Sequence, residues 1–128
     1  MKILILDDNP DMLRSLELIL QHAGFQIACA GNGRDALALQ KDGPADVLIT
    51  DILMPDVDGM EIIDQFRSRW PHVRIIAMSG GGDMVRADYL SVATQIGADV
   101  TLRKPVDPEK LLGLLSDFAK QPTGPRSA

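Results

Sequence analysis

Five short apolar runs are spread along the chain, and each is too nearly continuous for a strand that has one face in water. The runs are Lys2–Leu6, Phe25–Ala30, Val47–Thr50, Arg74–Met78 and Val100–Leu102. Runs of this length and composition are typical of strands that are buried on both faces. The pattern therefore predicts five strands in the interior of one sheet.

Between and after these runs, mostly apolar positions recur at the three- and four-residue spacing of an amphipathic helix. The five stripes are Met12, Leu13, Leu16, Ile19 and Leu20; Ala36, Leu37 and Gln40; Ile62, Ile63, Phe66 and Trp70; Val85, Tyr89, Val92 and Ile96; and Leu111, Leu114, Leu115 and Phe118. Helix starts are indicated by Pro10, Asp58, Asp83 and Asp107, and helix ends by Gly24, Gly43 and Gly97. A strand followed by a helix, five times over, predicts an α/β fold: a doubly wound, five-stranded parallel sheet flanked by five helices.

The length and composition fit a single domain. The chain has 128 residues, of which 45% are apolar, and this is enough to build one packed core. We expect that domain to span residues 1–120. The last eight residues, Gln121 to Ala128, lose the periodicity and gain Pro and Gly, so we expect a disordered tail there.

Charge and cysteine content exclude several classes of protein. The 18 acidic residues outnumber the 13 basic ones, which are scattered, so direct binding to nucleic acid is not expected. The first apolar run is too short for a signal peptide or a membrane span. Cys29 lies in an apolar segment, where a small core residue is expected rather than a nucleophile. We therefore expect a cytoplasmic protein that does not associate with a membrane.

Polar side chains stand where four of the predicted strands end. Asp7 and Asp8 follow the first strand, Asp51 the third, Ser79 the fourth and Lys104 the fifth. The carboxyl ends of parallel strands meet at one edge of a sheet, so these five residues should converge. Three carboxylates repel one another unless a cation lies among them, and a small set of oxygen ligands favours Mg²⁺. Lys104 and the Ser79 hydroxyl add donors, which predicts an anion beside the metal.

At these residues the sequence closely resembles the receiver domain of bacterial two-component response regulators. The resemblance rests on Asp7-Asp8 after ILIL, Asp51 in DILMPDVDG, Ser79 after RIIAM, and Lys104-Pro105 after GADVTL. It covers about the whole predicted domain. It implies a flavodoxin-like sheet with strand order 2-1-3-4-5 and a cis peptide bond between Lys104 and Pro105.

The resemblance also implies a function, that of a phosphoryl-accepting switch in a two-component phosphorelay. Asp51 would accept a phosphoryl group from a histidine kinase or a phosphotransfer protein. The implied Mg²⁺ ligands are Asp8, Asp51 and the backbone carbonyl of Leu53, with Asp7 acting mainly through water. Phosphoryl transfer depends on positioning and charge neutralisation, which Lys104 and the Ser79 hydroxyl would supply at the phosphoryl oxygens.

By this resemblance the chain is a signalling domain that catalyses its own phosphorylation, and not an enzyme that turns over an external substrate. Leu53 carries no group that could orient a hydrolytic water. We therefore expect slow self-dephosphorylation, which Leu53→Asn should accelerate.

One position departs from the family's pattern. Family members usually carry Tyr or Phe three residues before the lysine, a ring that swings inward on phosphorylation, whereas this chain has Thr101. We expect the signal to leave instead through the loop 80–82 and a helix at 83–96. It would remodel the surface that this helix shares with the strand at 100–102 and the helix after Asp107. A downstream protein, or a second copy of the chain, would bind there.

Two other functions compete with this interpretation. A phosphorylation-independent interaction module is disfavoured by the complete set of acids, serine and lysine. A small phosphatase that forms an aspartyl phosphate is disfavoured because Leu53 stands where such enzymes place a second acid.

Three other motifs carry little weight. Residues 7–11 fit a DDxxD pattern, but Pro10 follows a strand and the chain is too short for a large helical bundle. The glycines at 80–82 lack the spacing of a P-loop and form a hinge instead. His22 and His72 have no partner at ligand spacing, so we expect both to be solvated.

Overall fold

Five parallel strands form one sheet in the computed structural model, which describes residues 1–52, 59–80 and 91–120. They are β1 (Lys2–Leu6), β2 (Gln26–Ala30), β3 (Val47–Asp51), β4 (Arg74–Ser79) and β5 (Val100–Arg103). Their order across the sheet is β2-β1-β3-β4-β5, and every neighbouring pair is parallel. This confirms the predicted order, and it places the reversal of chain direction across the sheet between β1 and β3.

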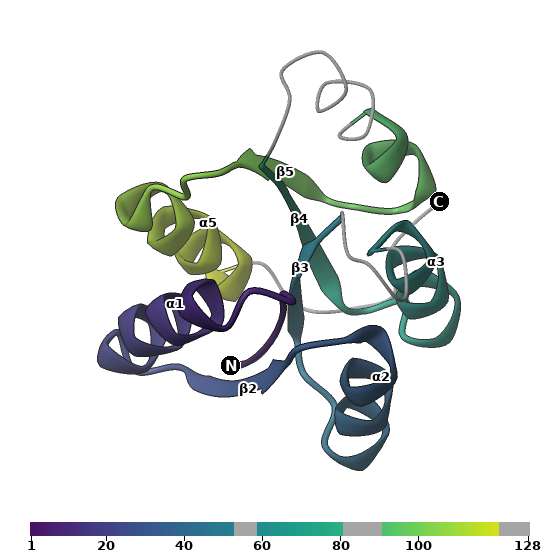
Figure 1. Cartoon of the computed structure of the whole chain (residues 1–128), viewed down its shortest axis with the longest axis horizontal. Helices are drawn as coiled ribbons and strands as arrows, with labels where there is room; N and C mark the ends of the chain where they lie inside the picture. The colour runs from purple at the N-terminus through teal and green to yellow at the C-terminus, as the bar shows by residue number, and fades with distance from the viewer. Residues whose placement is uncertain (53–58, 81–90, 121–128) are drawn as a thin grey trace.

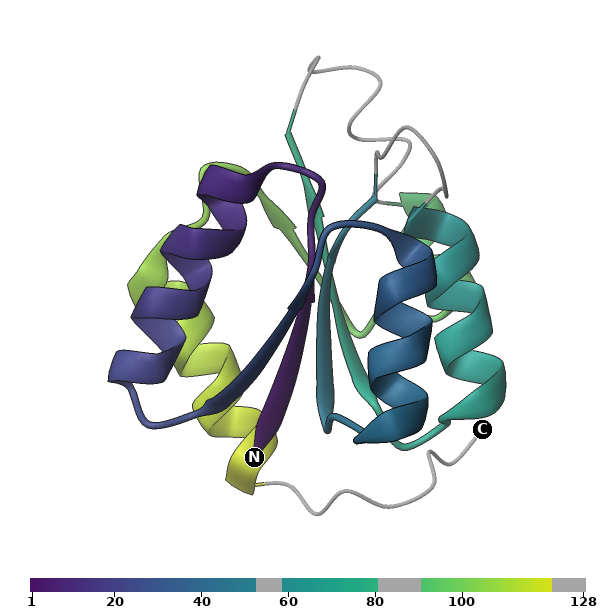
Figure 2. The ribbon, with the colours of Figure 1, turned by 60° about the horizontal axis from the view of Figure 1, so that its bottom comes forward.

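Helices cover both faces of the sheet (Figures 1 and 2). They are α1 (Pro10–His22), α2 (Gly33–Asp42), α3 (Gly59–Arg69) and α5 (Pro108–Lys120). Residues 91–96 are also helical and form the second half of the helix predicted at 83–96, whose first half lies outside the described residues. In Figure 2, α1 and α5 lie on one face of the sheet, and α2 and α3 lie on the other. The doubly wound α/β fold is confirmed.

The core has two halves, one on each face of the sheet. Alternate side chains of β1 point to opposite faces, so Leu4 and Leu6 pack with α2 and α3, whereas Ile3 and Ile5 pack with α1 and α5. Phe66 of α3 is fully buried and stacks at an angle on Trp70, with ring centroids 4.9 Å apart.

The prediction that all five strands are buried on both faces is wrong for β2 and β5. Strands β1, β3 and β4 are almost entirely buried, whereas β2 and β5 each have one buried residue and are otherwise half-buried or exposed. The reason is position, because β2 and β5 are the two edges of the sheet. An apolar run does not reveal which strands will be flanked on both sides.

Three of the predicted strands end one residue too early, because β3, β4 and β5 extend to Asp51, Ser79 and Arg103. Asp51 is the last residue of β3 and pairs with Met78, and Ser79 is the last residue of β4 and pairs with Arg103. The hydrogen bonds of a sheet are made by the backbone, so they continue past the last apolar side chain. The two polar residues are therefore held by the sheet itself.

Predicted helix boundaries are confirmed where the structure describes them. Asn9 caps α1, since its side chain accepts hydrogen bonds from the backbone N–H groups of Asp11 and Met12, and Pro10 is the first residue of the helix. Asp107 accepts a hydrogen bond from the N–H of Glu109 at the start of α5. The starts predicted at residues 58 and 83, and the tail 121–128, lie outside the described residues.

Candidate functional site

Three carboxylates meet where β1 and β3 end. One oxygen atom from each of Asp7, Asp8 and Asp51 lies within 4.8 Å of the others. Asp7 and Asp51 are buried, with 0% and 6% of their surface exposed, whereas Asp8 is exposed. The group forms because β1 and β3 are neighbours and end at the same edge of the sheet, as predicted. Of these three side chains, that of Asp8 is the one exposed to solvent.

Lys104 reaches this cluster from β5, across the intervening strand β4. Its ammonium nitrogen Nζ lies 2.8 Å from Asp7 Oδ2 and 3.2 Å from Asp51 Oδ2. Burial lowers the pKa of Lys104, but the hydrogen bond to Asp7 and the charges of Asp51 and Asp7 outweigh it, so the pKa is raised above its ordinary value. The lysine is therefore a firmly protonated cation between two acids.

The chain around Lys104 sets the direction of its side chain. The Lys104 N–H donates to the Ser79 carbonyl at 2.9 Å, and the Lys104–Pro105 peptide bond is cis, as predicted. A Cβ atom on Gly80 would lie 3.2 Å from Lys104 Cδ and 3.3 Å from its Cβ. Glycine at position 80 thus leaves room for the lysine stem, a packing role that the sequence did not reveal.

Asp7 is held by two donors. Its Oδ1 accepts a hydrogen bond from the Asn9 N–H at 3.0 Å, and its Oδ2 accepts one from Lys104. The side chain of Asn9 caps α1 at the same time. Sequence reasoning did not single out Asn9, although Asn directly before a helix is a recognisable capping signal.

Thr50 supports the backbone of Asp51. The ladder between β1 and β3 ends at the pair Leu6 and Thr50, one residue before Asp51. The hydroxyl of Thr50, which is fully buried, donates to the Asp51 carbonyl at 2.9 Å. Thr50 was predicted only as a strand residue, because a hydrogen bond to the following carbonyl has no sequence pattern.

Ser79 is fully buried, and among the described residues its Oγ is the buried side-chain atom that lacks a hydrogen-bond partner. Buried hydroxyl groups are nearly always hydrogen-bonded, so this one calls for an explanation. A hydroxyl at the end of β4, on a residue whose carbonyl accepts from the Lys104 N–H, is suited to donate to an anion that enters the site.

The donor set also fits the predicted cation. The three carboxylates offer oxygen atoms only, which Mg²⁺ prefers, and the exposed position of Asp8 leaves space for the waters that this ion retains. Leu53, whose carbonyl was predicted as a further ligand, lies outside the described residues, as do Gly81 and Gly82.

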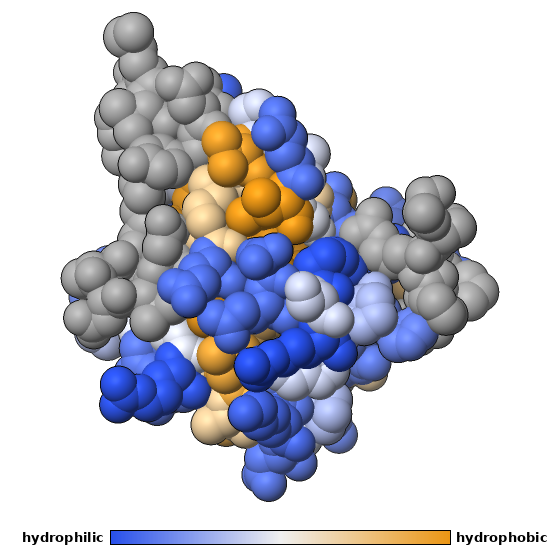
Figure 3. Space-filling view, turned by 90° about the vertical axis from the view of Figure 1, so that its right-hand side faces the viewer, coloured by the Kyte–Doolittle hydropathy of each residue, from blue (hydrophilic) through white to orange (hydrophobic). Residues whose placement is uncertain are grey.

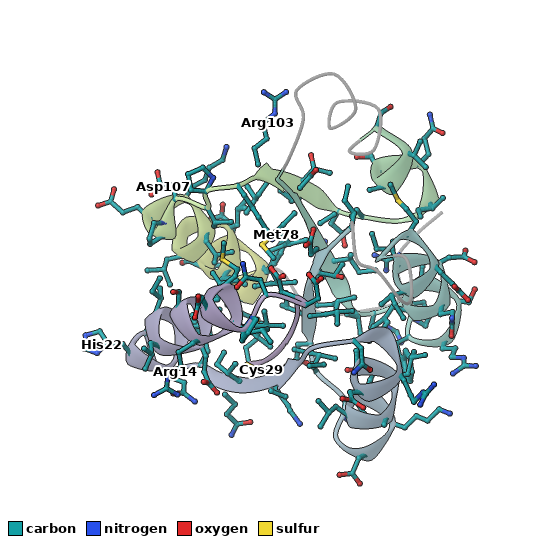
Figure 4. The ribbon with its side chains drawn as sticks, in the orientation of Figure 1. Arg14, His22, Cys29, Met78, Arg103 and Asp107 are labelled. Atoms are coloured by element: carbon teal, nitrogen blue, oxygen red, sulfur yellow. The ribbon has the colours of Figure 1, made fainter. Side chains whose placement is uncertain are left out.

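Two of the remaining candidates, His22 and Cys29, are labelled in Figure 4, on α1 and β2. His22, at the outer end of α1, and His72 are both exposed, as predicted. Cys29 is half-buried on β2 and packs against the core half that contains Ile3 and Ile5. Burial, together with the charge of Glu17 and a hydrogen bond to it, raises the pKa of the thiol to about 11, so Cys29 is not an activated nucleophile.

A groove lies beside β5. It has a volume of about 460 Å³ and lies between the helix at 91–96, β5 and the start of α5, and Thr94, Thr101, Arg103 and Lys110 are among its lining residues. Thr101 is half-buried, and Arg103 and Lys110 are exposed. Thr101, which stands where the family usually carries an aromatic ring, therefore lines a groove together with the charged residues Arg103, Asp107 and Lys110.

None of the helices in the described part of the chain has the length and apolar character needed to span a bilayer.

Comparison with known proteins gives consistent results. The family model described as the response regulator receiver domain matches residues 3–116. A response regulator receiver protein of Anaeromyxobacter sp. (strain Fw109-5) is 35% identical over 111 residues, which are 87% of this chain and 45% of that protein. An uncharacterized 14.6 kDa protein of Leptolyngbya boryana is 31% identical over 120 residues, which are 92% of this chain and 89% of that protein.

Solved structures show the same fold. A response regulator receiver domain protein from Clostridium thermocellum has a TM-score of 0.84 and 30% identity, and the match covers 93% of this chain and 94% of that one. Among curated relatives, the chain spans 26% of the transcriptional regulatory protein GlrR of Escherichia coli and 52% of KdpE of Mycobacterium tuberculosis. The chain thus spans about a quarter to a half of the length of several regulators that it matches.

Proposed function

Since the chain belongs to the family of response regulator receiver domains, we propose that it is a phosphoryl-accepting switch of a two-component system, with Asp51 as the acceptor. One observation carries this assignment. The carboxylate of Asp51 lies 3.2 Å from the Lys104 ammonium and within a cluster of three acids. Of those acids, Asp51 alone is the terminal residue of its strand, and its backbone is further held by Thr50.

In the transfer, an oxygen of Asp51 forms a bond to phosphorus while the bond from phosphorus to the histidine nitrogen of the donor breaks. Lys104, which stays protonated, neutralises charge on the phosphoryl oxygens as a point charge. The unpartnered Oγ of Ser79 donates to one of those oxygens and so gains the hydrogen bond that it lacks.

The residues that would hold Mg²⁺ are Asp8 and Asp51, together with the carbonyl of Leu53. The ion, when bound, supplies positive charge that neutralises the phosphoryl oxygens. Asp7 has both oxygens engaged, by Asn9 and Lys104, which supports the prediction that it acts on the metal through water.

The chain promotes its own phosphorylation, and the aspartyl phosphate decays slowly. The phosphoryl group comes from a histidine kinase or a phosphotransfer protein, and the cytoplasmic location stays a prediction from the sequence. The phosphorylation-independent module is not favoured, because the acids, serine and lysine are assembled in one place.

The output is a change in the binding of a downstream protein, or of a second copy of the chain. We place this contact on the face formed by residues 91–96, β5 and α5, where the groove beside Thr101 lies. The exposed cations Arg103 and Lys110 at its rim suit a partner segment that carries acidic side chains.

The test is to incubate the protein with Mg²⁺ and a small phosphodonor such as acetyl phosphate, and to measure its intact mass over time. The wild type should gain the mass of one phosphoryl group, and Asp51→Asn should gain none. Asp64→Asn, which removes an exposed acid of α3, is the matched control and should label normally. Labelling of Asp51→Asn at the rate of the wild type would show that another residue is the acceptor.

A further inference from the structure

Arg67, in the last turn of α3, ties together segments that are distant in sequence. Its guanidinium donates to the Gly97 carbonyl from both Nε, at 3.2 Å, and Nη2, at 2.7 Å. Nη1 donates to the carbonyls of Pro71 and Val73, each at 3.0 Å. One side chain thus links the end of α3, the connection to β4, and the residue that follows the helix at 91–96.

The same guanidinium is paired with an acid. Nη2 of Arg67 lies 3.0 Å from Asp99 Oδ2, and that oxygen also accepts a hydrogen bond from the Ile75 N–H at 2.7 Å. The Asp99 N–H in turn donates to the Ile75 carbonyl at 2.8 Å. The two charged side chains are 20% and 6% exposed, so water screens this pair little. The start of β5 is thereby fixed to the start of β4.

The backbone conformation of Gly97 and its lack of a side chain allow the close approach of Arg67. The φ of Gly97, +136°, favours glycine, and a Cβ atom there would lie 3.0 Å from Arg67 Cγ. The N–H of Ala98 donates to the Ala93 carbonyl at 2.9 Å, which closes the last turn of the helix. A cation at this end of a helix also complements the helix dipole.

Along the rest of this helix the packing is sparse. In residues 91–96, Ala93 is fully buried and Ile96 is half-buried, while the other four residues are exposed. Val92, with 44% of its surface exposed, belongs to this segment. Figure 3 shows apolar side chains gathered in the upper part of the side of the molecule that carries α2, α3 and residues 91–96. Within residues 91–96, the helix is therefore held more firmly at its C-terminal end than before it.

The chain leaves the phosphoryl site along two routes. One runs from Asp51 toward α3, and the other runs from Ser79 toward the helix at 91–96. The two segments meet again where α3 and the helix at 91–96 end, because Arg67 at the end of α3 donates to the Gly97 carbonyl. A movement that begins at Ser79 can pass along the helix at 91–96, whose end at Gly97 carries this linkage.

We propose that Arg67 is a fixed anchor, so that phosphorylation turns the helix at 91–96 about Gly97 and leaves β5 in place. The displacement is then largest toward residue 91 and falls to nothing at Gly97. Such a turn changes the face that carries Val92 and the wall of the groove that contains Thr94, without disturbing the sheet that positions Lys104. This inference rests on the proposed function, because it describes how the signal from Asp51 is transmitted.

The experiment compares amide hydrogen exchange with and without beryllofluoride, a phosphoryl mimic, in the presence of Mg²⁺. In the wild type, the exchange of residues 91–96 should change and that of residues 98–102 should not. In Arg67→Met, the change should extend beyond Gly97 into β5, and Ala98 and Asp99 should exchange about tenfold faster even without the mimic. Arg69→Met, which removes an exposed arginine of the same turn, is the matched control and should behave as the wild type.

Arg67→Lys is the second variant, in case the methionine variant does not fold. Lysine keeps the positive charge but lacks the planar guanidinium group, which donates to several acceptors at once. The exchange changes should therefore again extend beyond Gly97. Intact-mass labelling of each variant separates the two hypotheses. If the wild type takes no phosphoryl group, the proposed function is wrong, and the anchor with it. If it labels, but its exchange changes run past Gly97, or both Arg67 variants keep the wild-type boundary, the anchor alone is wrong.

Discussion

The ammonium of Lys104 lies closer to Asp7, at 2.8 Å, than to the proposed acceptor Asp51, at 3.2 Å. Asp7 follows β1 and Lys104 follows β5, so this pair spans most of the sheet. An incoming phosphoryl group would therefore compete with Asp7 for the lysine. The site holds its cation between two acids before any phosphoryl group arrives.

Lys104→Met should slow phosphorylation of Asp51 by a small donor roughly 100-fold, because it removes a preorganised charge that stabilises the developing phosphoryl charge. It should also lower the free energy of unfolding by about 2 kcal/mol, since two buried carboxylates, Asp7 and Asp51, would lose the cation that lies between them. Intact-mass kinetics and urea denaturation measure the two effects. Lys110→Met, which removes an exposed lysine, is the control, and equal rates for the two variants would contradict the assigned role.

Ser79 and Thr50 provide opposite tests of a buried hydroxyl. Ser79→Ala removes a hydroxyl that lacks a partner, so the free energy of unfolding should stay constant or rise by up to about 1 kcal/mol. Thr50→Val removes a hydroxyl that donates to the Asp51 carbonyl, so it should lower the free energy of unfolding by about 1 kcal/mol. Urea denaturation of both variants makes the comparison. A clear loss of stability in Ser79→Ala would mean that this hydroxyl already has a partner in solution.

Mg²⁺ should stabilise the folded protein, because an ion that binds only the native state adds about 2.7 kcal/mol at 100 times its Kd. Asp8→Asn should weaken this gain, and without Mg²⁺ it should not destabilise the fold, because it relieves repulsion among three acids. Thermal unfolding with and without Mg²⁺ measures both effects. Asp11→Asn, which alters an exposed acid in the first turn of α1, should keep the full response to the ion.

The thiol of Cys29 should react slowly with alkylating reagents in the folded protein. Its pKa of about 11, against an ordinary value of 9.0, leaves on the order of 100-fold less thiolate at pH 8. Because the folded-state pKa is raised, the contribution to stability is complete below pH 9 and is lost as pH rises toward 11. Alkylation rates in native and denaturing buffer test the first statement. Denaturation of the wild type and Cys29→Ser between pH 8 and pH 11 tests the second, and parallel curves would contradict it.

The sequence determined the order and type of the elements, because these depend on short-range patterns. Burial on both faces demands a continuous apolar run, and such runs marked the interior strands β1, β3 and β4 to within a residue. The helix starts at Pro10 and after Asp107 were likewise predicted from local signals. The convergence of Asp7, Asp8, Asp51, Ser79 and Lys104 also followed from sequence, since the carboxyl ends of parallel strands share one edge.

Other features depend on distances that only the folded sheet sets. The twist and register of the strands decide that Lys104 reaches Asp7 and that a Cβ atom at position 80 would lie in tight contact with the lysine stem. They also decide that β2 and β5 are edges and that Ser79 keeps an unpartnered hydroxyl. The contact of Arg67 with Gly97 joins residues 30 positions apart. No periodicity in the sequence encodes such a contact, because it arises only when α3 and the helix at 91–96 end beside each other on the same face of the sheet.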